Sequence, residues 1–191
     1  RAQSLFEPEE YVNPLMGTES SFELSTGNTY PAIARPWGMN FWMPQTGKMG
    51  DGWAYVYTAK KIRGFKQTHQ PSPWINDYLA DYDVVTEFTT TERAALFCFT
   101  FPESDRSYVV VDAFDRGSFV KIVGNNRIEG YTTRNSGGVP GNFKNYFVIE
   151  FDKPFDYKHT FADGKLSDDL EQLSQHVGGV IGFRTKKGEK V

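Results

Sequence analysis

The stretch Tyr108–Thr133 reads YVVVDAFDRGSFVKIVGNNRIEGYTT, and it decides the fold class. It holds three short, mostly apolar segments of the length expected for β-strands. Asp115-Arg116-Gly117 separates the first two segments, and Asn125-Asn126 precedes the third; both groups are typical of tight turns. The three segments are Tyr108–Phe114, Phe119–Val123 and Arg127–Thr133. The stretch therefore predicts three consecutive strands joined by short turns.

A period of two continues on both sides of this stretch. In Arg93–Phe101 the side chains of Ala95, Phe97, Phe99 and Phe101 fall on one face of an extended chain. Phe143–Phe151 alternates in the same way, and Val177–Thr185 predicts a last strand before a Lys187-Gly188 turn. Strands at this spacing indicate an all-β fold, an antiparallel β-sandwich.

Two further features of the sequence predict local structure other than regular strands. Only Ser167–His176 has helical spacing, with Leu170 and Leu173 three residues apart, so we expect at most one short helix, around Asp168–Gln175. The glycine pairs Gly137-Gly138 and Gly178-Gly179 predict turn and bulge positions.

The composition bounds the class of protein. The chain has 191 residues, of which 16% are aromatic, and a formal net charge of −3. It is long enough to bury a core as one domain over residues 1–191. The near-neutral charge gives no reason to expect nucleic acid as a partner, and no apolar run is long enough to span a membrane. The single Cys98 excludes an internal disulfide and reads as a small core side chain.

Residues 13–78 differ in composition from the rest of the chain. This segment contains all four tryptophans and is interrupted by proline and glycine, so we expect it to be rich in loops. No internal repeat, linker or low-complexity tract divides the chain.

General catalytic motifs are absent from the sequence. His69, His159 and His176 are too scattered to predict a metal site, and no hydrolase or phosphate-binding motif occurs. Asp81 and Asp83 are best interpreted as solvated loop acids. We therefore assign neither catalytic nor metal-binding residues from the sequence.

The most distinctive candidate for a functional site is the run Gly64–Tyr78, GFKQTHQPSPWINDY. Two prolines stiffen it just before Trp74, and Asn76 and Asp77 follow, with His69 upstream. An indole can stack on the apolar face of a pyranose, while amide, carboxylate and imidazole groups pair with its hydroxyls. We predict that these four residues bind a sugar. The alternative is that Trp74 fills the core while Asn76 and Asp77 cap a turn.

Four ordered segments resemble the N-terminal domain of glycoside hydrolase family 92. They are Tyr11–Thr18 (YVNPLMGT), Gly27–Gly38 (GNTYPAIARPWG), Ile62–Tyr78 (IRGFKQTHQPSPWINDY) and Tyr131–Glu150 (YTTRNSGGVPGNFKNYFVIE). The resemblance implies a bacterial exo-acting α-mannosidase that hydrolyses terminal mannose with inversion and with the help of calcium. It also implies an N-terminal β-sandwich followed by a C-terminal (α/α)6 barrel. The HQPSPWINDY form resembles the α-1,2-type enzymes.

The chain also departs from this family pattern. It ends at Val191, inside the expected sandwich, so the barrel with the general acid, the general base and most calcium contacts is missing. At Tyr78–Leu79 the sequence reads as though a segment that relatives contain were left out. We expect a secreted or periplasmic enzyme whose isolated N-terminal part is inactive, whose substrate is a mannose-containing glycan and whose sandwich docks on its own C-terminal catalytic domain.

Two further hypotheses remain open at this point. One is a stand-alone carbohydrate-binding β-sandwich in which Trp74 and its neighbours form the whole site. The other is a structural domain that supports a barrel. If a barrel docks on this domain, we expect an exposed apolar patch, with Trp37, Trp42 and Trp53 as candidates.

Overall fold

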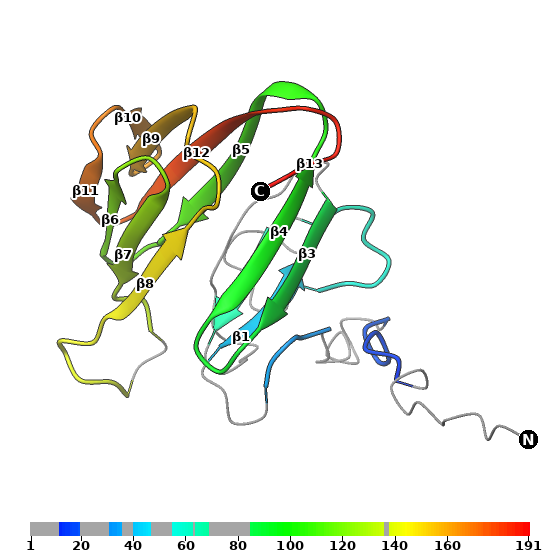
Figure 1. Cartoon of the computed structure of the whole chain (residues 1–191). Coiled ribbons are helices and arrows are strands. Elements are labelled where there is room, and N and C mark those ends of the chain that lie inside the picture. The colour runs from blue at the N-terminus through cyan, green and yellow to red at the C-terminus, as the bar shows by residue number, and fades with distance from the viewer. Residues whose placement is uncertain are drawn as a thin grey trace, which may run out of the picture.

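The computed structural model describes residues 12–19, 31–35, 40–46, 55–62, 64–68, 85–135 and 138–191 (Figure 1). Across these ranges the regular elements are all β-strands, and neighbouring strands pair in antiparallel fashion. The predicted all-β fold is confirmed. The strands are β1 (Phe41–Gln45), β2 (Gly64–Thr68), β3 (Val85–Thr90), β4 (Ala95–Phe101), β5 (Ser104–Asp112), β6 (Ser118–Val123), β7 (Arg127–Thr132), β8 (Asn145–Glu150), β9 (Tyr157–Ala162), β10 (Lys165–Ser167), β11 (Glu171–Ser174), β12 (Val177–Thr185) and β13 (Glu189–Lys190).

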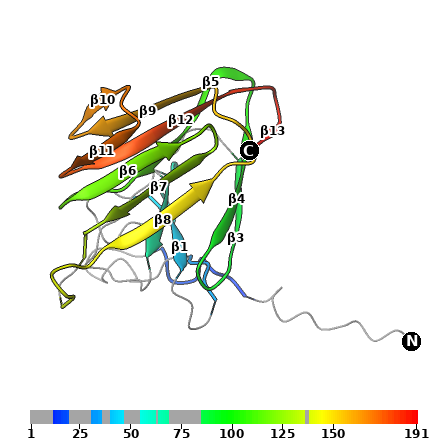
Figure 2. The same cartoon turned by 60° about the vertical axis from the view of Figure 1, so that its left-hand side comes forward.

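Two four-stranded sheets form the sandwich (Figure 2). One has the order β10-β9-β12-β5 and the other β11-β6-β7-β8. Apolar side chains from the facing sides of both sheets fill the space between them. The fully buried ones include Val120, Ile128, Val177, Ile181 and Phe183. The alternation seen in the sequence thus places one side of each strand in a shared core.

The β6–β7–β8 meander follows the sequence prediction closely. β6 and β7 are joined by a three-residue turn in which Gly124, at φ 63°, takes the left-handed conformation. Asn125 and Asn126, which indicate this turn in the sequence, do not have a positive φ. Glycine adopts this conformation without steric cost, so the turn places its left-handed residue at Gly124 and not at the asparagines.

The segment that could have formed the one short helix contains a strand instead. Within Asp168–Gln175 the chain forms β11, which pairs with β6 in the register Leu173↔Phe119. Leu170 also contributes, since its carbonyl accepts a hydrogen bond from the Ile122 amide at 2.8 Å. Pairing at the edge of an existing sheet outweighs the weak helical spacing of two leucines, because a helix this short is marginal in water.

The interpretation of Gly178-Gly179 as a turn or bulge is also wrong. Both glycines lie inside β12, are buried and pair in regular register with β5 and β9. The irregularity in β12 falls between Phe183 and Thr185 instead. A Cβ on Gly179 would come within 2.4 Å of Ile128 Cδ1, so glycine here lets the two sheets approach. Gly138, by contrast, has a φ of 72° and lies in a bend, as expected.

A second, smaller unit stands beside the sandwich. It consists of the sheet β13-β4-β3 and the hairpin-like pair β1-β2 (Figures 1 and 2). Phe101 at the end of β4 and Val191, which bonds to Phe99 of the same strand at 2.8–3.0 Å, both belong to the sandwich core. These contacts join the smaller unit to the sandwich.

Candidate functional site

The predicted sugar-binding residues His69, Trp74, Asn76 and Asp77 lie outside the described residues. So do Trp37 and Trp53. The structure does describe the strands on either side of the predicted loop, because β2 ends at Thr68 and β3 begins at Val85.

An aromatic cluster holds these two strands together. Phe65 of β2 makes an edge contact with Phe88 of β3, with ring centroids 5.0 Å apart, and a second one with Phe97 of β4 at 6.1 Å. Trp42 of β1 meets Phe97 edge-on at 4.7 Å, and Phe88 stacks on Phe97 at 5.1 Å. Each such pair contributes about 0.5–1.5 kcal/mol beyond its buried area. Both ends of the predicted loop are therefore anchored on one rigid cluster.

Trp42 is half-buried in this cluster, and its Nε1 donates to Asn40 Oδ1 at 2.6 Å. It was one of three tryptophans that we expected at an exposed apolar patch. It packs edge-on against Phe97 and keeps part of its surface exposed.

Several charged and polar side chains gather where β5 turns into β6. We call residues Asp112–Ser118 the β5–β6 corner. Phe114 and Arg116 have φ values of 64° and 69°, which are costly for residues with a Cβ, about 1–3 kcal/mol each. Such strain persists only where surrounding contacts hold it in place.

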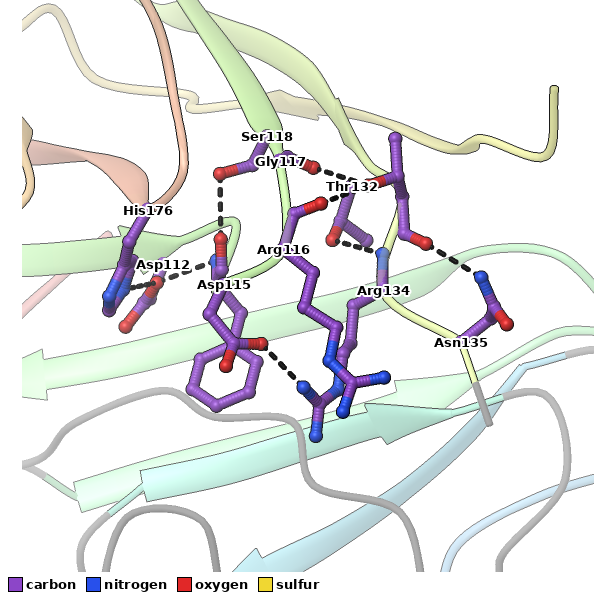
Figure 3. Close-up of polar contacts among 11 residues, drawn as sticks. Asp112, Asp115, Arg116, Gly117, Ser118, Thr132, Arg134, Asn135 and His176 are labelled. Carbon is purple, nitrogen blue, oxygen red and sulfur yellow. Dashed lines mark hydrogen bonds and ion pairs between the residues drawn. The ribbon is translucent and has the colours of Figure 1, made fainter. Parts of the chain in front are cut away.

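Hydrogen bonds from distant strands provide those contacts (Figure 3). Ser118 Oγ donates to the Phe114 carbonyl at 2.7 Å and accepts from the Val177 amide at 3.0 Å. Thr133 Oγ1 donates to the Arg116 carbonyl at 2.7 Å, while the Gly117 amide donates to the Gln175 carbonyl at 3.0 Å. The corner is thus held by the end of β7 and by the segment that enters β12.

An ion pair extends the corner toward the segment after β7. Arg134 Nη1 donates to Asp115 Oδ1 at 2.8 Å, and its guanidinium carbon lies 5.5 Å from the Phe114 ring centre. The Arg134 side chain is only 12% exposed. Asn135 Nδ2 donates to the Thr133 carbonyl at 2.9 Å, so the chain leaving β7 is positioned by side chains as well as by backbone.

A second pair lies at the start of the corner. Asp112 Oδ1 accepts from the Phe114 amide at 2.8 Å and lies 2.8 Å from His176 Nε2. Burial raises the pKa of Asp112 above its ordinary value of 3.8, and the nearby His176 only partly opposes this effect. His176 itself lies edge-on to Phe114 and to Phe161, with centroids 5.6 and 5.8 Å apart.

The contacts of the β5–β6 corner favour a role in positioning the backbone over a role in proton transfer. Both of its carboxylates are engaged by a cationic or imidazole partner, and their hydrogen bonds order the local backbone. Sequence reasoning read Asp115-Arg116-Gly117 as a turn, which is correct, but missed the pairing. The only local signal was two acids three residues apart, and their partners lie 19 and 64 residues away.

Within the described ranges, no group of three or more His, Cys, Asp or Glu side chains could hold a metal ion. The same ranges contain no helix long and apolar enough to cross a membrane.

Comparison with known proteins relates this fold to one family. The chain matches the model of the glycosyl hydrolase family 92 N-terminal domain over residues 11–80 and 76–191. It is similar to the family GH92 inverting mannosidase BT2199 from Bacteroides thetaiotaomicron VPI-5482, with 39% identity and a TM-score of 0.87. That match covers 99% of this chain and 31% of the mannosidase. No curated protein matches the chain.

Two more distant structures share the fold. The family GH92 α-mannosidase BT3965 from Bacteroides thetaiotaomicron is 22% identical with a TM-score of 0.74, covering 95% of this chain and 32% of that one. The family GH92 glycosyl hydrolase ccman5 is 19% identical with a TM-score of 0.70, covering 91% and 30%. The chain thus spans less than a third of the length of each relative. It belongs to glycoside hydrolase family 92 and corresponds to the N-terminal domain of that family.

Proposed function

We propose that this chain is the N-terminal domain of an inverting exo-α-mannosidase that removes terminal mannose from glycans, with a preference for α-1,2 linkages. The observation that carries the proposal is the 39% identity to an inverting mannosidase over 99% of the chain. The α-1,2 preference rests on the HQPSPWINDY form of the loop.

In this proposal the loop that contains Trp74 contributes to the mannose-binding pocket. Trp74 stacks on the apolar face of the terminal sugar, and His69, Asn76 and Asp77 pair with its hydroxyls. Pro71 and Pro73 restrict the backbone before the indole, so little conformational entropy is lost on binding. The aromatic cluster of Phe65, Phe88 and Phe97 supports this role because it anchors the strands from which the loop emerges.

Catalytic groups come from the remaining part of the enzyme. Inversion needs a general acid and a general base about 6.5–9.5 Å apart, with a water between the base and the sugar. In the β5–β6 corner Asp112 and Asp115 are held by His176 and Arg134, so neither is placed for this task. The described residues offer no metal cluster that fits calcium. We assign calcium mainly to the catalytic domain.

An exposed apolar row supports attachment to such a domain. On the outward side of the sheet β11-β6-β7-β8, paired positions line up from Leu173 through Phe119 and Tyr131 to Tyr146. Leu173 and Tyr146 are 68% and 70% exposed. Exposed apolar patches commonly mark interfaces. The enzyme that we propose is secreted or periplasmic, where glycan substrates are accessible.

The test is mannose release by the intact protein from α-1,2-linked mannobiose, followed by proton NMR of the first product. We expect β-mannose to appear before mutarotation, and slower release from α-1,3- and α-1,6-linked substrates. First-formed α-mannose would contradict inversion. Binding of mannosides without any hydrolysis would instead favour the stand-alone carbohydrate-binding sandwich.

A further inference from the structure

The outward side of the sheet β10-β9-β12-β5 has an unusual arrangement of rings and glycines. Tyr157 and Phe161 lie four residues apart on β9 and therefore on the same side of the sheet. On the neighbouring strand β12 their partners are Gly182 and Gly178, in the register Gly182↔Tyr157 and Gly178↔Phe161. Each ring thus stands beside a position without a side chain.

Both rings occupy the space above these glycines. A Cβ on Gly182 would come within 1.8 Å of Tyr157 Cε2, and a Cβ on Gly178 within 2.3 Å of Phe161 Cζ. Tyr157 Oη donates to the Ser107 carbonyl of β5 at 2.8 Å, so this side chain reaches across β12. Each ring therefore packs on the backbone of β12, while both side chains keep part of their surface exposed.

Polar groups alternate with the rings. His159 lies between Tyr157 and Phe161 on the same side of β9, and its Nδ1 lies 2.9 Å from Asp168 Oδ1. The His159 and Asp168 side chains are 41% and 96% exposed, so both remain available to a ligand. His176 lies beside Phe161, with ring centroids 5.8 Å apart. We call Tyr157, His159 and Phe161, with Gly178 and Gly182 beneath, the β9–β12 aromatic face.

We propose that the β9–β12 aromatic face binds a neutral pyranose chain as a carbohydrate-binding surface additional to the Trp74 loop. Rings fixed on a backbone lose little entropy when the apolar face of a sugar packs on them. Four residues of strand span about 13 Å, so the two rings can contact different sugars of one chain. If the partner were a purely apolar protein surface, binding would remove the His159–Asp168 pair from water without replacing its hydrogen bonds, which costs free energy. Sugar hydroxyls, in contrast, can form hydrogen bonds with both groups.

The experiment is affinity electrophoresis of the intact protein in gels that contain a neutral α-mannan. Phe161→Ala removes one ring, and Gly182→Ala displaces the Tyr157 ring by placing a methyl group where it lies. We expect each variant to bind mannan at least tenfold more weakly than the unaltered protein. The matched control is Leu96→Ala, which removes a 70% exposed apolar side chain from β4, outside this face, and should leave mannan binding unchanged.

Stability and activity measurements separate the outcomes. His159→Ala changes an exposed side chain and keeps both rings, so it tests the polar part of the surface even if Phe161→Ala fails to fold. Weaker mannan binding by folded variants, with unchanged kcat/KM on soluble mannobiose, supports the inference. Unchanged mannan binding by folded Gly182→Ala and His159→Ala overturns it, because the rings then only stabilise the sheet. Preference for an acidic polysaccharide, lost at high salt, also overturns it.

This inference does not depend on the proposed hydrolysis. A protein that releases no mannose, yet binds mannan through Phe161, would refute the mannosidase proposal and leave the aromatic face intact. If the protein hydrolyses mannobiose and these variants leave its mannan binding unchanged, the aromatic face is refuted and the mannosidase proposal is kept.

Discussion

At the scale of single residues, the domain concentrates strain and charge in the β5–β6 corner. Phe114 and Arg116 adopt left-handed backbone conformations without being glycine. Arg134 compensates, because one buried guanidinium contacts both the Asp115 carboxylate and the Phe114 ring. We regard this arginine as the residue that keeps the corner in its observed conformation.

Replacing Arg134 with alanine should destabilise the domain by about 1–3 kcal/mol, because Asp115 loses its partner and the strained backbone loses a contact. The measurement is the free energy of unfolding in urea. Arg127→Ala is the control, since its pairs with Glu129 and Glu150 join partly exposed side chains. Such pairs contribute about 0–1 kcal/mol. An equal loss in both variants would contradict the special role of Arg134.

Trp74→Ala should lower kcat/KM on α-1,2-mannobiose at least tenfold, about 1.4 kcal/mol of transition-state binding. If the indole contacts sugar, the melting temperature should hardly change. The opposite result, normal kinetics with a loss of about 3–5 kcal/mol in stability, would make Trp74 a core residue.

Asp112 should impose a pH dependence on stability. Because burial raises its pKa in the folded state, the folded chain holds this proton more tightly than the unfolded chain does. The resulting stabilisation is complete below the unfolded value of 3.8 and is lost as the pH rises through the folded pKa. As the pH rises above 3.8 and through the folded pKa of Asp112, the unaltered protein should therefore lose stability relative to Asp112→Asn.

Urea unfolding at several pH values checks this prediction. Asp115→Asn serves as the comparison, because its carboxyl is 45% exposed. A free-energy difference between the unaltered protein and Asp112→Asn that does not change with pH would show that Asp112 has the same proton affinity in both states.

At the scale of elements, one strand couples the loop-rich segment to the sandwich. Phe97 of β4 contacts Trp42, Phe65 and Phe88, while Phe101 at the end of the same strand reaches the sandwich core. β4 thereby connects the strands that flank the predicted loop with the rigid part of the fold.

Phe97→Ala should remove this connection and destabilise the protein by about 3 kcal/mol, as for other large-to-small changes in packed sites. We also expect kcat/KM on mannobiose to fall, since the strands flanking the Trp74 loop lose their common support. Phe97→Leu keeps much of the apolar volume and should recover most of both losses. Loss of stability with unchanged kcat/KM would separate the cluster from the active site.

At the scale of the whole molecule, the chain covers 31% of a related inverting mannosidase. Asp112 and Asp115 are engaged in structural pairs, and the outward side of the sheet β11-β6-β7-β8 carries an exposed apolar row. These features are consistent with the proposal that the catalytic groups belong to another part of the enzyme.

The 191-residue chain alone should release no mannose from an α-mannoside in the presence of calcium. The reason is that the proposed general acid and base belong to another part of the enzyme. The measurement is mannose release against a sample without protein, with the intact protein as the positive control. Turnover by the chain alone would mean that it carries its own carboxylate pair, with Asp77 the first residue to test.

The sequence by itself determined the type of structure and much of the strand order along the chain. β12 has the predicted bounds, the Lys187-Gly188 turn is present with Gly188 at φ 77°, and the β6–β7 turn lies where Asn125-Asn126 indicated. These features depend on alternation and on turn residues, which act between near neighbours in the sequence. The motifs also predicted the family correctly, because four ordered segments do not arise by chance.

Only the tertiary structure decided the features that depend on partners far away in the chain. β11 is a strand because β6 offers it an unpaired edge, and Gly178 lies in a strand because β12 pairs with β5 and β9 on both sides. Asp112 and His176 meet although 64 residues separate them. Hydrogen bonds and packing between distant segments outweigh local preferences of a few tenths of a kcal/mol per residue, and no local pattern records which segments will meet.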